Sequence, residues 1–292
     1  MKFGYILPNF GDKISPKELV DISTFCEAEG FDSVWATDHI IMPVELNEPY
    51  GQVLEPLATL SFIAAKTEKL KLGTSCIVMP QRNPVLVAKQ AATLDVFSKG
   101  RVILGLGAGW AEKEFGFLNA DFARRGQVFD ESISLMKALW NDEVINFEGK
   151  FFNIKNALFL PKPQNKTIPV WIGGNGPASV RRAAKLGDGW HPVGPSLEDF
   201  ASGVDKIRAS GRRLTMSVRM TTDVRKKRES YSSASGEKRT IASGSAAEIR
   251  KFIEDFEDAG LAHYCASILH PSAADIMADL KKFAADIVRS YG

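Results

Sequence analysis

Residues 169–186, PVWIGGNGPASVRRAAKL, pass from a short apolar run through a glycine-rich turn into a longer segment of helical period. Pro169 to Ile172 has the length and apolar character of a buried strand, and Pro177 stands where proline is favoured, in the first turn of a helix. A strand followed by a short turn and a helix is the repeating unit of α/β proteins with a parallel sheet. The stretch therefore predicts one βα unit.

Eight such units can be found along the chain. Most of the predicted strands lack polar alternation, as expected of strands that are covered on both faces. Several helices begin at a capping signal, such as Ser15-Pro16, Asn83-Pro84 or Ser245, and Gly30 and Gly260 stand where helices end. The predicted strands are Phe3 to Leu7, Ser33 to Ala36, Leu70 to Thr74, Val102 to Leu106, Pro169 to Ile172, Asp188 to His191, Leu214 to Met220 and His263 to Ile268.

This periodicity predicts an α/β fold, a single (β/α)8 TIM barrel with insertion loops, in which residues 1–292 form one domain. An open, doubly wound sheet of this size would more often show a break in composition between its halves. Three segments exceed a minimal connection: residues 37–54, 108–124 and 141–166, the last turning at Gly149 as a hairpin would. Residues 225–244, rich in Ser, Lys and Arg, are predicted to form a mobile loop.

The composition is that of an ordinary globular protein, with 45% hydrophobic and 25% charged residues. A formal net charge of +2 gives no reason to expect a nucleic acid or a membrane as partner, which leaves a small-molecule substrate. The three cysteines form no CxxC pair and no histidines stand at HxxxH spacing, so no metal site is expected. Without a secretory signal or a long apolar run, we expect a cytoplasmic protein.

The candidate site residues follow the predicted strands, because the carboxyl ends of all barrel strands face one shared cavity. Asp38 and His39 come after the second strand, and an imidazole there is either a proton-handling group or a hydrogen-bonded structural histidine. Other groups follow the third, fourth and fifth strands: Thr74, Ser75 and Cys76; Ala108, Gly109 and Trp110; Gly173, Gly174, Asn175, Gly176, Pro177 and Ala178.

The turn from Gly173 to Ala178 has two interpretations. Its glycines leave backbone N–H groups open at the start of a helix, where the helix dipole favours a phosphate. An ordinary βα turn also uses Gly and Pro. The segment Gly105 to Gly109 contains G-x-G but not the full dinucleotide spacing, so it indicates a close approach of backbone to a flat ligand rather than a Rossmann site.

Together and in order, these segments resemble the luciferase-like monooxygenase superfamily of flavin barrels, specifically the branch that uses the deazaflavin coenzyme F420. The resemblance extends from about residue 3 to 190. It rests on WATDH at 35–39, LGTSC at 72–76, RNP at 82–84, AKQ at 88–90, TLD at 93–95, SKGR at 98–101, GLGAGW at 105–110, GG at 173–174 and GDGW at 187–190.

The resemblance implies coenzyme F420, or alternatively FMN, lying across the barrel mouth with its phosphate in the turn from Gly173 to Ala178. It implies that the Ser75–Cys76 peptide bond is cis, and that Asp38 and His39 hydrogen-bond the deazaflavin. Thr74, Ala108, Gly109 and Trp110 would line the same cofactor site. The catalytic residues expected from it are His39, Asp38 and Trp110.

One departure concerns the substrate. Sugar-phosphate dehydrogenases of this family have a catalytic glutamate where this chain has Trp110, so that Glu112 or Glu114 would have to replace it. Three functions stay open: an F420-dependent oxidoreductase, an FMN-dependent monooxygenase supplied by a separate flavin reductase, and a flavin-binding barrel without turnover. Family members are commonly homodimers, for which the apolar faces of the helix from Val85 to Phe97 could provide the interface, although these faces could equally pack on the barrel.

Overall fold

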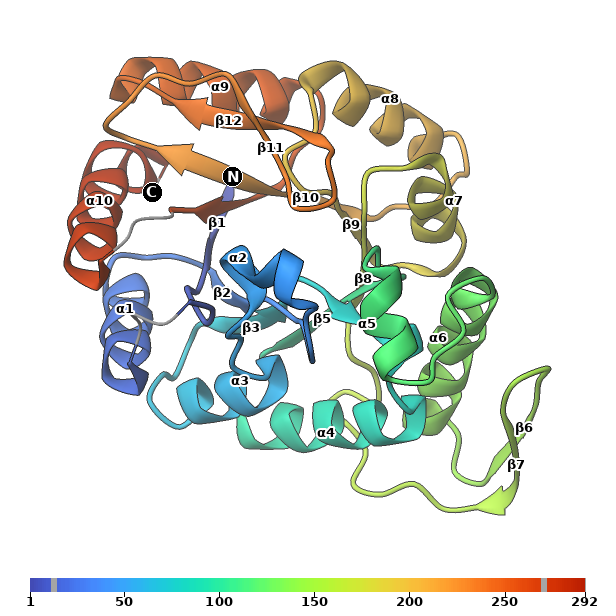
Figure 1. Cartoon of the computed structure of the whole chain (residues 1–292). Coiled ribbons are helices and arrows are strands. Elements are labelled where there is room, and N and C mark those ends of the chain that lie inside the picture. Colours follow the sequence, from blue (N-terminus) through green and yellow to red (C-terminus); the bar gives the residue numbers. More distant parts are fainter. Residues whose placement is uncertain (12–14, 269–271, 292) are drawn as a thin grey trace.

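Eight parallel strands close into a barrel, as the sequence predicts (Figure 1). The computed structural model describes residues 1–11, 15–268 and 272–291. β1 pairs with both β2 and β13, and β10 pairs with both β9 and β13, which closes the ring. The barrel strands are β1 (Lys2–Ile6), β2 (Ser33–Ala36), β3 (Lys71–Thr74), β5 (Val102–Gly107), β8 (Val170–Gly173), β9 (Gly189–His191), β10 (Thr215–Asp223) and β13 (His263–Ser267).

Helices surround the strands on the outside of the barrel (Figure 1). The predicted start signals are confirmed: Ser15 and Ser245 each form a capping box, and the Asn83 side chain accepts hydrogen bonds from two backbone N–H groups. Gly30 and Gly260 follow helix ends with positive φ, as expected of C-terminal caps. The outer helices are α1 (Pro16–Ala28), α3 (Pro56–Ala64), α4 (Pro84–Phe97), α6 (Arg125–Asn141), α7 (Pro177–Leu186), α8 (Leu197–Arg208), α9 (Ala246–Asp258) and α10 (Ala273–Asp286).

Two tryptophans fill the barrel interior, and glycines make room for them. Trp35 and Trp171 lie with their ring centroids 5.0 Å apart. A Cβ at Gly73 would come within 2.2 Å of the Trp35 ring, and one at Gly189 within 2.6 Å of Trp171. The interior is therefore a packed core, so a ligand has room only beyond it, where the strands end.

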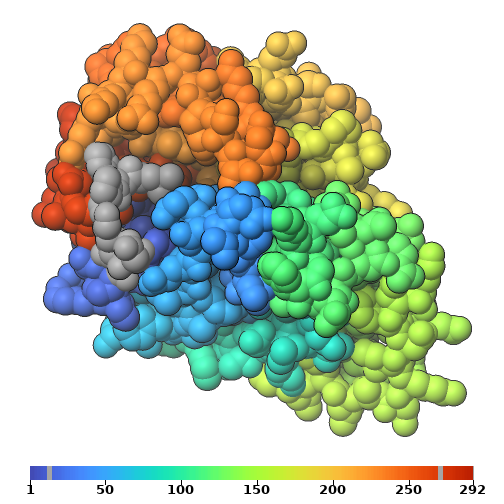
Figure 2. All heavy atoms as spheres, in the orientation of Figure 1, coloured from blue at the N-terminus to red at the C-terminus, as the bar shows by residue number. Residues whose placement is uncertain are grey.

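The long connections after β2 and β5 form short helices that lie over the middle of the ring of strands (Figure 1). The first holds η1 (Val44–Leu46) and α2 (Asn47–Tyr50), and the second holds α5 (Glu112–Phe117). An ion pair between Glu45 and Lys113 joins them, and Figure 2 shows the two segments, blue and green, side by side at the surface. Both insertions thus cover the carboxyl ends of the strands.

Of the two other long connections, one has the predicted structure and the other does not. The hairpin predicted within residues 141–166 is confirmed as β6 (Ile145–Glu148) and β7 (Asn153–Ala157). Residues 225–244, predicted to be a loop, instead contain β11 (Ser230–Ser232) and β12 (Lys238–Ser243), and β12 pairs with the end of β10. The prediction was wrong because Ile241 and Ala242 are buried there, and two apolar residues among polar ones carry too weak a pattern to indicate a strand. Shorter elements are β4 (Ile77–Val78), η2 (Met79–Gln81) and η3 (Val288–Tyr291).

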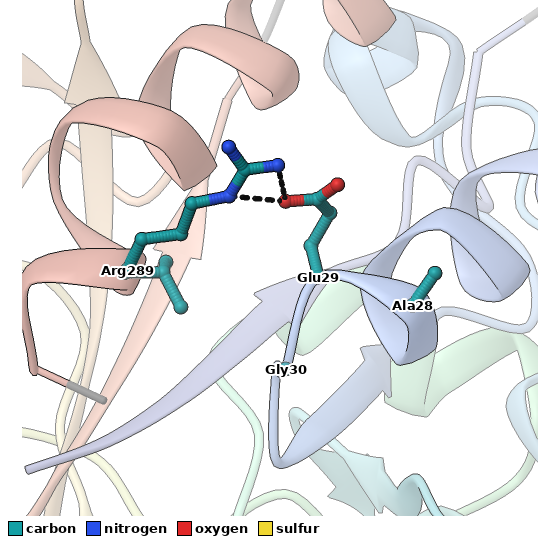
Figure 3. A pocket seen from close by; sticks show the side chains of 5 residues that line it. Ala28, Glu29, Gly30 and Arg289 are labelled. Atoms are coloured by element: carbon teal, nitrogen blue, oxygen red, sulfur yellow. Dashed lines mark hydrogen bonds and ion pairs between the residues drawn. The ribbon is translucent and has the colours of Figure 1, made fainter.

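Two hollows lie at the opposite, amino-terminal end of the barrel. One, of about 420 Å³, is lined by residues at strand starts such as Lys71, Val102 and Thr215. The other lies at the end of α1, where Arg289 donates hydrogen bonds to Glu29 (Figure 3). Neither hollow contains a residue predicted for the site. Within the described ranges, no helix is long and apolar enough to cross a bilayer.

Candidate active site

His39 and Glu114 form a buried pair at the barrel mouth. The Nδ1 atom of His39 lies 3.0 Å from Oε2 of Glu114, and the other carboxylate oxygen of Glu114 accepts the backbone N–H of Ile40 at 2.7 Å. Glu114 is 1% exposed. Burial acts to raise its pKa, but the hydrogen bond and charge of His39 and the backbone donor outweigh this, so the pKa of Glu114 is lowered. Glu114 is therefore a carboxylate, and it fixes the Nδ1–H tautomer of His39.

Two aromatic rings hold the imidazole of His39 in place. The ring of Tyr50, from α2, lies 4.6 Å from it, and Trp110 approaches it edge to face at 5.8 Å. The Nε2 atom of His39 has no hydrogen-bond partner in the part of the chain that the structure describes. This nitrogen is therefore left to accept or donate a proton.

Asp38 has a different role from its neighbour in the sequence. Its Oδ2 atom accepts the backbone N–H of Val78 at 2.9 Å, and Oδ1 accepts from Arg82 at 2.6 Å. Both carboxylate oxygens thus tie the connection after β2 to the segment after β3. A hydrogen bond between Asp38 and a cofactor, as the resemblance implies, stays a prediction.

A chain of hydrogen bonds crosses the barrel beneath the mouth. The Ser75 hydroxyl lies 2.9 Å from Nε2 of His191, and Nδ1 of His191 lies 2.7 Å from the Ser217 hydroxyl, which donates to the carbonyl of Trp190. Since Ser217 donates onward, His191 donates from Nδ1 and Ser75 donates to Nε2. Burial lowers the pKa of His191 to about 3, and the positive charge of Arg219 adds to this effect. His191 is therefore neutral and holds Ser75 in place.

The Ser75–Cys76 peptide bond is cis, as the resemblance implies. The Cys76 side chain contacts β8, because a Cβ at Gly173 would lie 2.4 Å from its sulfur. Burial raises the pKa of the Cys76 thiol to about 12, although Arg219 acts in the opposite direction. Cys76 is thus a protonated thiol that packs at the mouth and not a nucleophile.

The turn predicted to bind phosphate is the start of α7. Gly176 is the N-cap residue, and no side chain caps this helix end. A Cβ at Gly176 would meet no atom within 4 Å, so the space beside the helix N-terminus is open. The Asn175 side chain makes two hydrogen bonds with the backbone of Val193, which fixes the turn. Uncapped N–H groups facing open space are what an anionic group requires.

The glycine-rich segment after β5 is explained only in part by the protein's own packing. A Cβ at Gly105 would lie 1.9 Å from the carbonyl oxygen of Thr74, and Gly109 has φ +83° with the ring of Phe115 beside it. Gly107 has no such neighbour: its nearest contact would be 3.7 Å, to Cys76. A side chain would fit there, so Gly107 is the position in this segment at which a ligand can approach the backbone.

The structure brings some predicted residues together and adds others. Direct contacts join His39 to Trp110 and Cys76 to Gly173. The Thr74 hydroxyl instead bonds the carbonyl of Gly105 at 2.7 Å and stabilises the strands. No group of three or more His, Cys, Asp or Glu side chains among the described residues could hold a metal ion.

Arg219 is a residue of the mouth that was not predicted from the sequence. It is a charged residue inside the predicted strand Leu214 to Met220, and that unusual position was the available signal. Its side chain donates to the Thr37 hydroxyl at 3.1 Å and to the carbonyl of Ser75 at 3.0 Å. Arg219 therefore reaches from β10 to the ends of β2 and β3.

Comparison with known proteins decides the family. The model of the family described as luciferase-like monooxygenase matches residues 1–257. The chain belongs to the luciferase-like monooxygenase family. This luciferase-like protein is 32% identical over 197 residues to a protein named F420-dependent glucose-6-phosphate dehydrogenase from Kineococcus radiotolerans, which covers 65% of this chain and 56% of that relative. The chain thus spans only about half the length of the curated relatives it matches.

Solved structures support the barrel fold of this luciferase-like protein. An F420-dependent secondary alcohol dehydrogenase in complex with an F420–acetone adduct superposes with a TM-score of 0.82, at 21% identity and 98% coverage of both chains. A monooxygenase from Streptomyces bottropensis superposes with a TM-score of 0.84, at 19% identity and full coverage of both chains. At these identities the likeness concerns the fold alone.

Proposed function

We propose that this protein is an F420-dependent oxidoreductase that transfers a hydride between the deazaflavin ring and a small organic substrate. The observation that carries the proposal is the His39–Glu114 pair, which holds one imidazole nitrogen and leaves the other at the barrel mouth. The relatives named F420-dependent dehydrogenases support the choice of coenzyme. We further propose that the whole chain acts as one barrel domain.

The residues at the mouth fit a phosphate-bearing flat coenzyme. The uncapped start of α7 and the open space at Gly176 suit the phosphate. Gly107, next to Cys76, leaves room for a flat ring to approach the backbone. We therefore propose that Gly173 to Ala178 hold the phosphate, and that Ala108, Gly109 and the Ser75–Cys76 peptide lie against the ring.

The chemistry divides between coenzyme and protein. The deazaflavin supplies a two-electron hydride carrier, while the protein supplies positioning and proton transfer. In the oxidation of an alcohol, Nε2 of His39 accepts the hydroxyl proton; in the reverse direction it returns that proton to the carbonyl oxygen. The carboxylate of Glu114 stabilises the positive charge that His39 gains, which is the function of the carboxylate in a catalytic triad.

The mouth favours a substrate other than a sugar phosphate. The indole N–H of Trp110 is too weak an acid to protonate a substrate oxygen, and Glu114 already binds His39 and two backbone N–H groups. Ile40, Ile41 and Trp110 are exposed beside His39 and give the rim an apolar character. We propose a small alcohol or carbonyl compound with an apolar part.

Turnover with oxidised F420 tests this function. The protein is mixed with the coenzyme and a panel of small alcohols that includes glucose 6-phosphate, and the loss of deazaflavin absorbance is followed. We expect reduction by a simple alcohol, and a rate at least about 100-fold lower for His39→Asn when each protein is saturated with F420. Equal rates for the variant and the wild type would refute the assigned role of His39.

Assembly and location are also proposals. The outer faces of α3 and α4 carry exposed apolar side chains, among them Phe62, Leu86 and Phe97, the last 67% exposed. A homodimer would bury them. The three cysteines are all free, which favours a reducing compartment such as the cytoplasm.

A further inference from the structure

Arg219 is a buried cation at the barrel mouth. It is only 7% exposed. Its Nη1 atom donates to the Thr37 hydroxyl and to the carbonyl of Ser75, both of which are neutral acceptors. In the described part of the chain, no carboxylate lies within 4.0 Å of the guanidinium. The positive charge of Arg219 is therefore not compensated by the protein.

The other charges near the mouth are paired. Asp38 is paired with Arg82 at 2.6 Å, and Arg82 also lies 3.3 Å from Glu55. Glu114 is engaged by His39. Asp38 and Glu114 are thus already bound by other groups, and neither forms an ion pair with Arg219.

Two nitrogens of Arg219 remain available to a ligand. Nε and Nη2 have no hydrogen-bond partner among the described residues. Neither nitrogen is among the enclosed side-chain atoms without a partner in the described residues, and 7% of the Arg219 surface stays exposed. An adjacent pair of guanidinium donors matches a planar anion in a two-point hydrogen bond.

We propose that Arg219 binds a planar anionic group of the ligand that fills the mouth. The group is either a carboxylate of the substrate or the delocalised N–C=O anion of the reduced deazaflavin ring. This inference rests on the proposed function, because it assigns the substrate and the coenzyme ring to this cavity. Burying a charge is unfavourable unless it is paired, so the bound anion would supply the charge partner that Arg219 lacks among the described residues.

The first experiment uses the protein without coenzyme. Benzoate and its neutral analogue benzamide are titrated while the melting temperature is recorded. We expect benzoate to raise the melting temperature of the wild type and to bind at least about 10-fold more weakly to Arg219→Gln. Arg219→Lys keeps the positive charge and should keep part of the affinity for benzoate. Benzamide should act equally on all three. The matched control is Arg289→Gln, at the opposite end of the barrel.

The second experiment compares oxidised and reduced F420. The two forms differ only in the ring, so the ratio of their dissociation constants measures how the protein distinguishes the reduced ring from the oxidised one. If the ring is the anion, Arg219→Gln weakens the reduced form at least about 10-fold more than the oxidised form. The proposal is overturned if neither benzoate binding nor this ratio responds to Arg219→Gln, or if Arg289→Gln has the same effects. Should the wild type bind no F420 at all, the proposed function fails while the benzoate titration still decides the role of Arg219.

Discussion

His39 shows how neighbours give a side chain its role. Asp38 and His39 are adjacent in sequence, yet the carboxylate of Asp38 is bound by Val78 and Arg82 while the imidazole faces Glu114, 75 residues along the chain. One carboxylate therefore organises the loops and the other orients the imidazole. The proposed reaction depends on the second arrangement, because it leaves Nε2 of His39 available.

A double-mutant cycle tests whether Glu114 acts through His39. Glu114→Gln keeps the shape but loses the charge, and should lower the turnover rate at least about 10-fold, because it no longer stabilises the protonated imidazole of His39. In a His39→Asn background the same change should cost much less, since the group it orients is gone. The readout is kcat for coenzyme reduction in the four proteins. Additive losses would mean that Glu114 acts independently, and Glu112→Gln, exposed on the same helix, is the matched control.

At the scale of elements, the start of α7 combines a stable turn with an unfilled helix end. Gly176 has φ −73° and ψ 162°, a conformation open to any residue, and it has free space at Cβ. The sequence at this position therefore gives up a cap that Asp or Asn would provide. The absence of a side-chain cap is expected where the helix N-terminus binds a ligand.

Gly176→Asp should therefore change stability and affinity in opposite directions. The new carboxylate caps α7 and should raise the free energy of unfolding by a few tenths of a kcal/mol. It also repels the coenzyme phosphate, so the affinity for F420 should fall at least about 10-fold. Gly176→Asn caps the helix without the charge and serves as the control. An Asp variant that binds F420 as tightly as the Asn variant would argue against phosphate binding at this turn.

Some helices and strands of this protein can be predicted from the sequence, and others cannot. The eight barrel strands and the caps at Ser15, Asn83 and Ser245 follow from local signals, because buried strands and helix starts have strong patterns. β12 was missed because its pairing with β10 comes from tertiary context. The contact of Glu114 with His39 could not be derived either, since Glu114 lies in the first turn of α5, where acidic residues are common for local reasons.

At the scale of the whole molecule, buried histidines make the barrel sensitive to acid. Burial lowers the pKa of both His191 and His263 to about 3, against an ordinary value near 6.5. Below that ordinary value the unfolded chain takes up protons that the folded chain does not, so stability present above pH 6.5 is lost as the pH falls towards 3. Each histidine should cost about 2 kcal/mol between pH 7 and pH 5.

Urea unfolding at several pH values measures this loss. His263→Gln should remove about half of the acid-dependent part, whatever its effect on stability at neutral pH. His263 hydrogen-bonds Ser33 far from the mouth, so the variant should leave coenzyme binding intact. An unchanged slope with pH would show that other groups cause the acid sensitivity.

The proposed dimer makes a separate prediction. Leu86 and Phe97 are exposed on α4, and a glutamate at either position would place a charge in the interface. Leu86→Glu combined with Phe97→Glu should weaken association at least about 100-fold, or roughly 3 kcal/mol. Sedimentation measures the association of the double variant. The control is Leu158→Glu, because Leu158 is exposed and directly follows β7. A double variant that sediments like the wild type would place the interface elsewhere, or show that the protein is a monomer.

The coenzyme of this protein can be determined by titrating it with oxidised F420 and, separately, with FMN, while the fluorescence is followed. The start of α7 suits the phosphate of either coenzyme, but the relatives named as F420-dependent lead us to expect that F420 binds at least about 10-fold more tightly than FMN. Tight binding of FMN with weak or absent binding of F420 would contradict the account and favour a flavin-dependent monooxygenase.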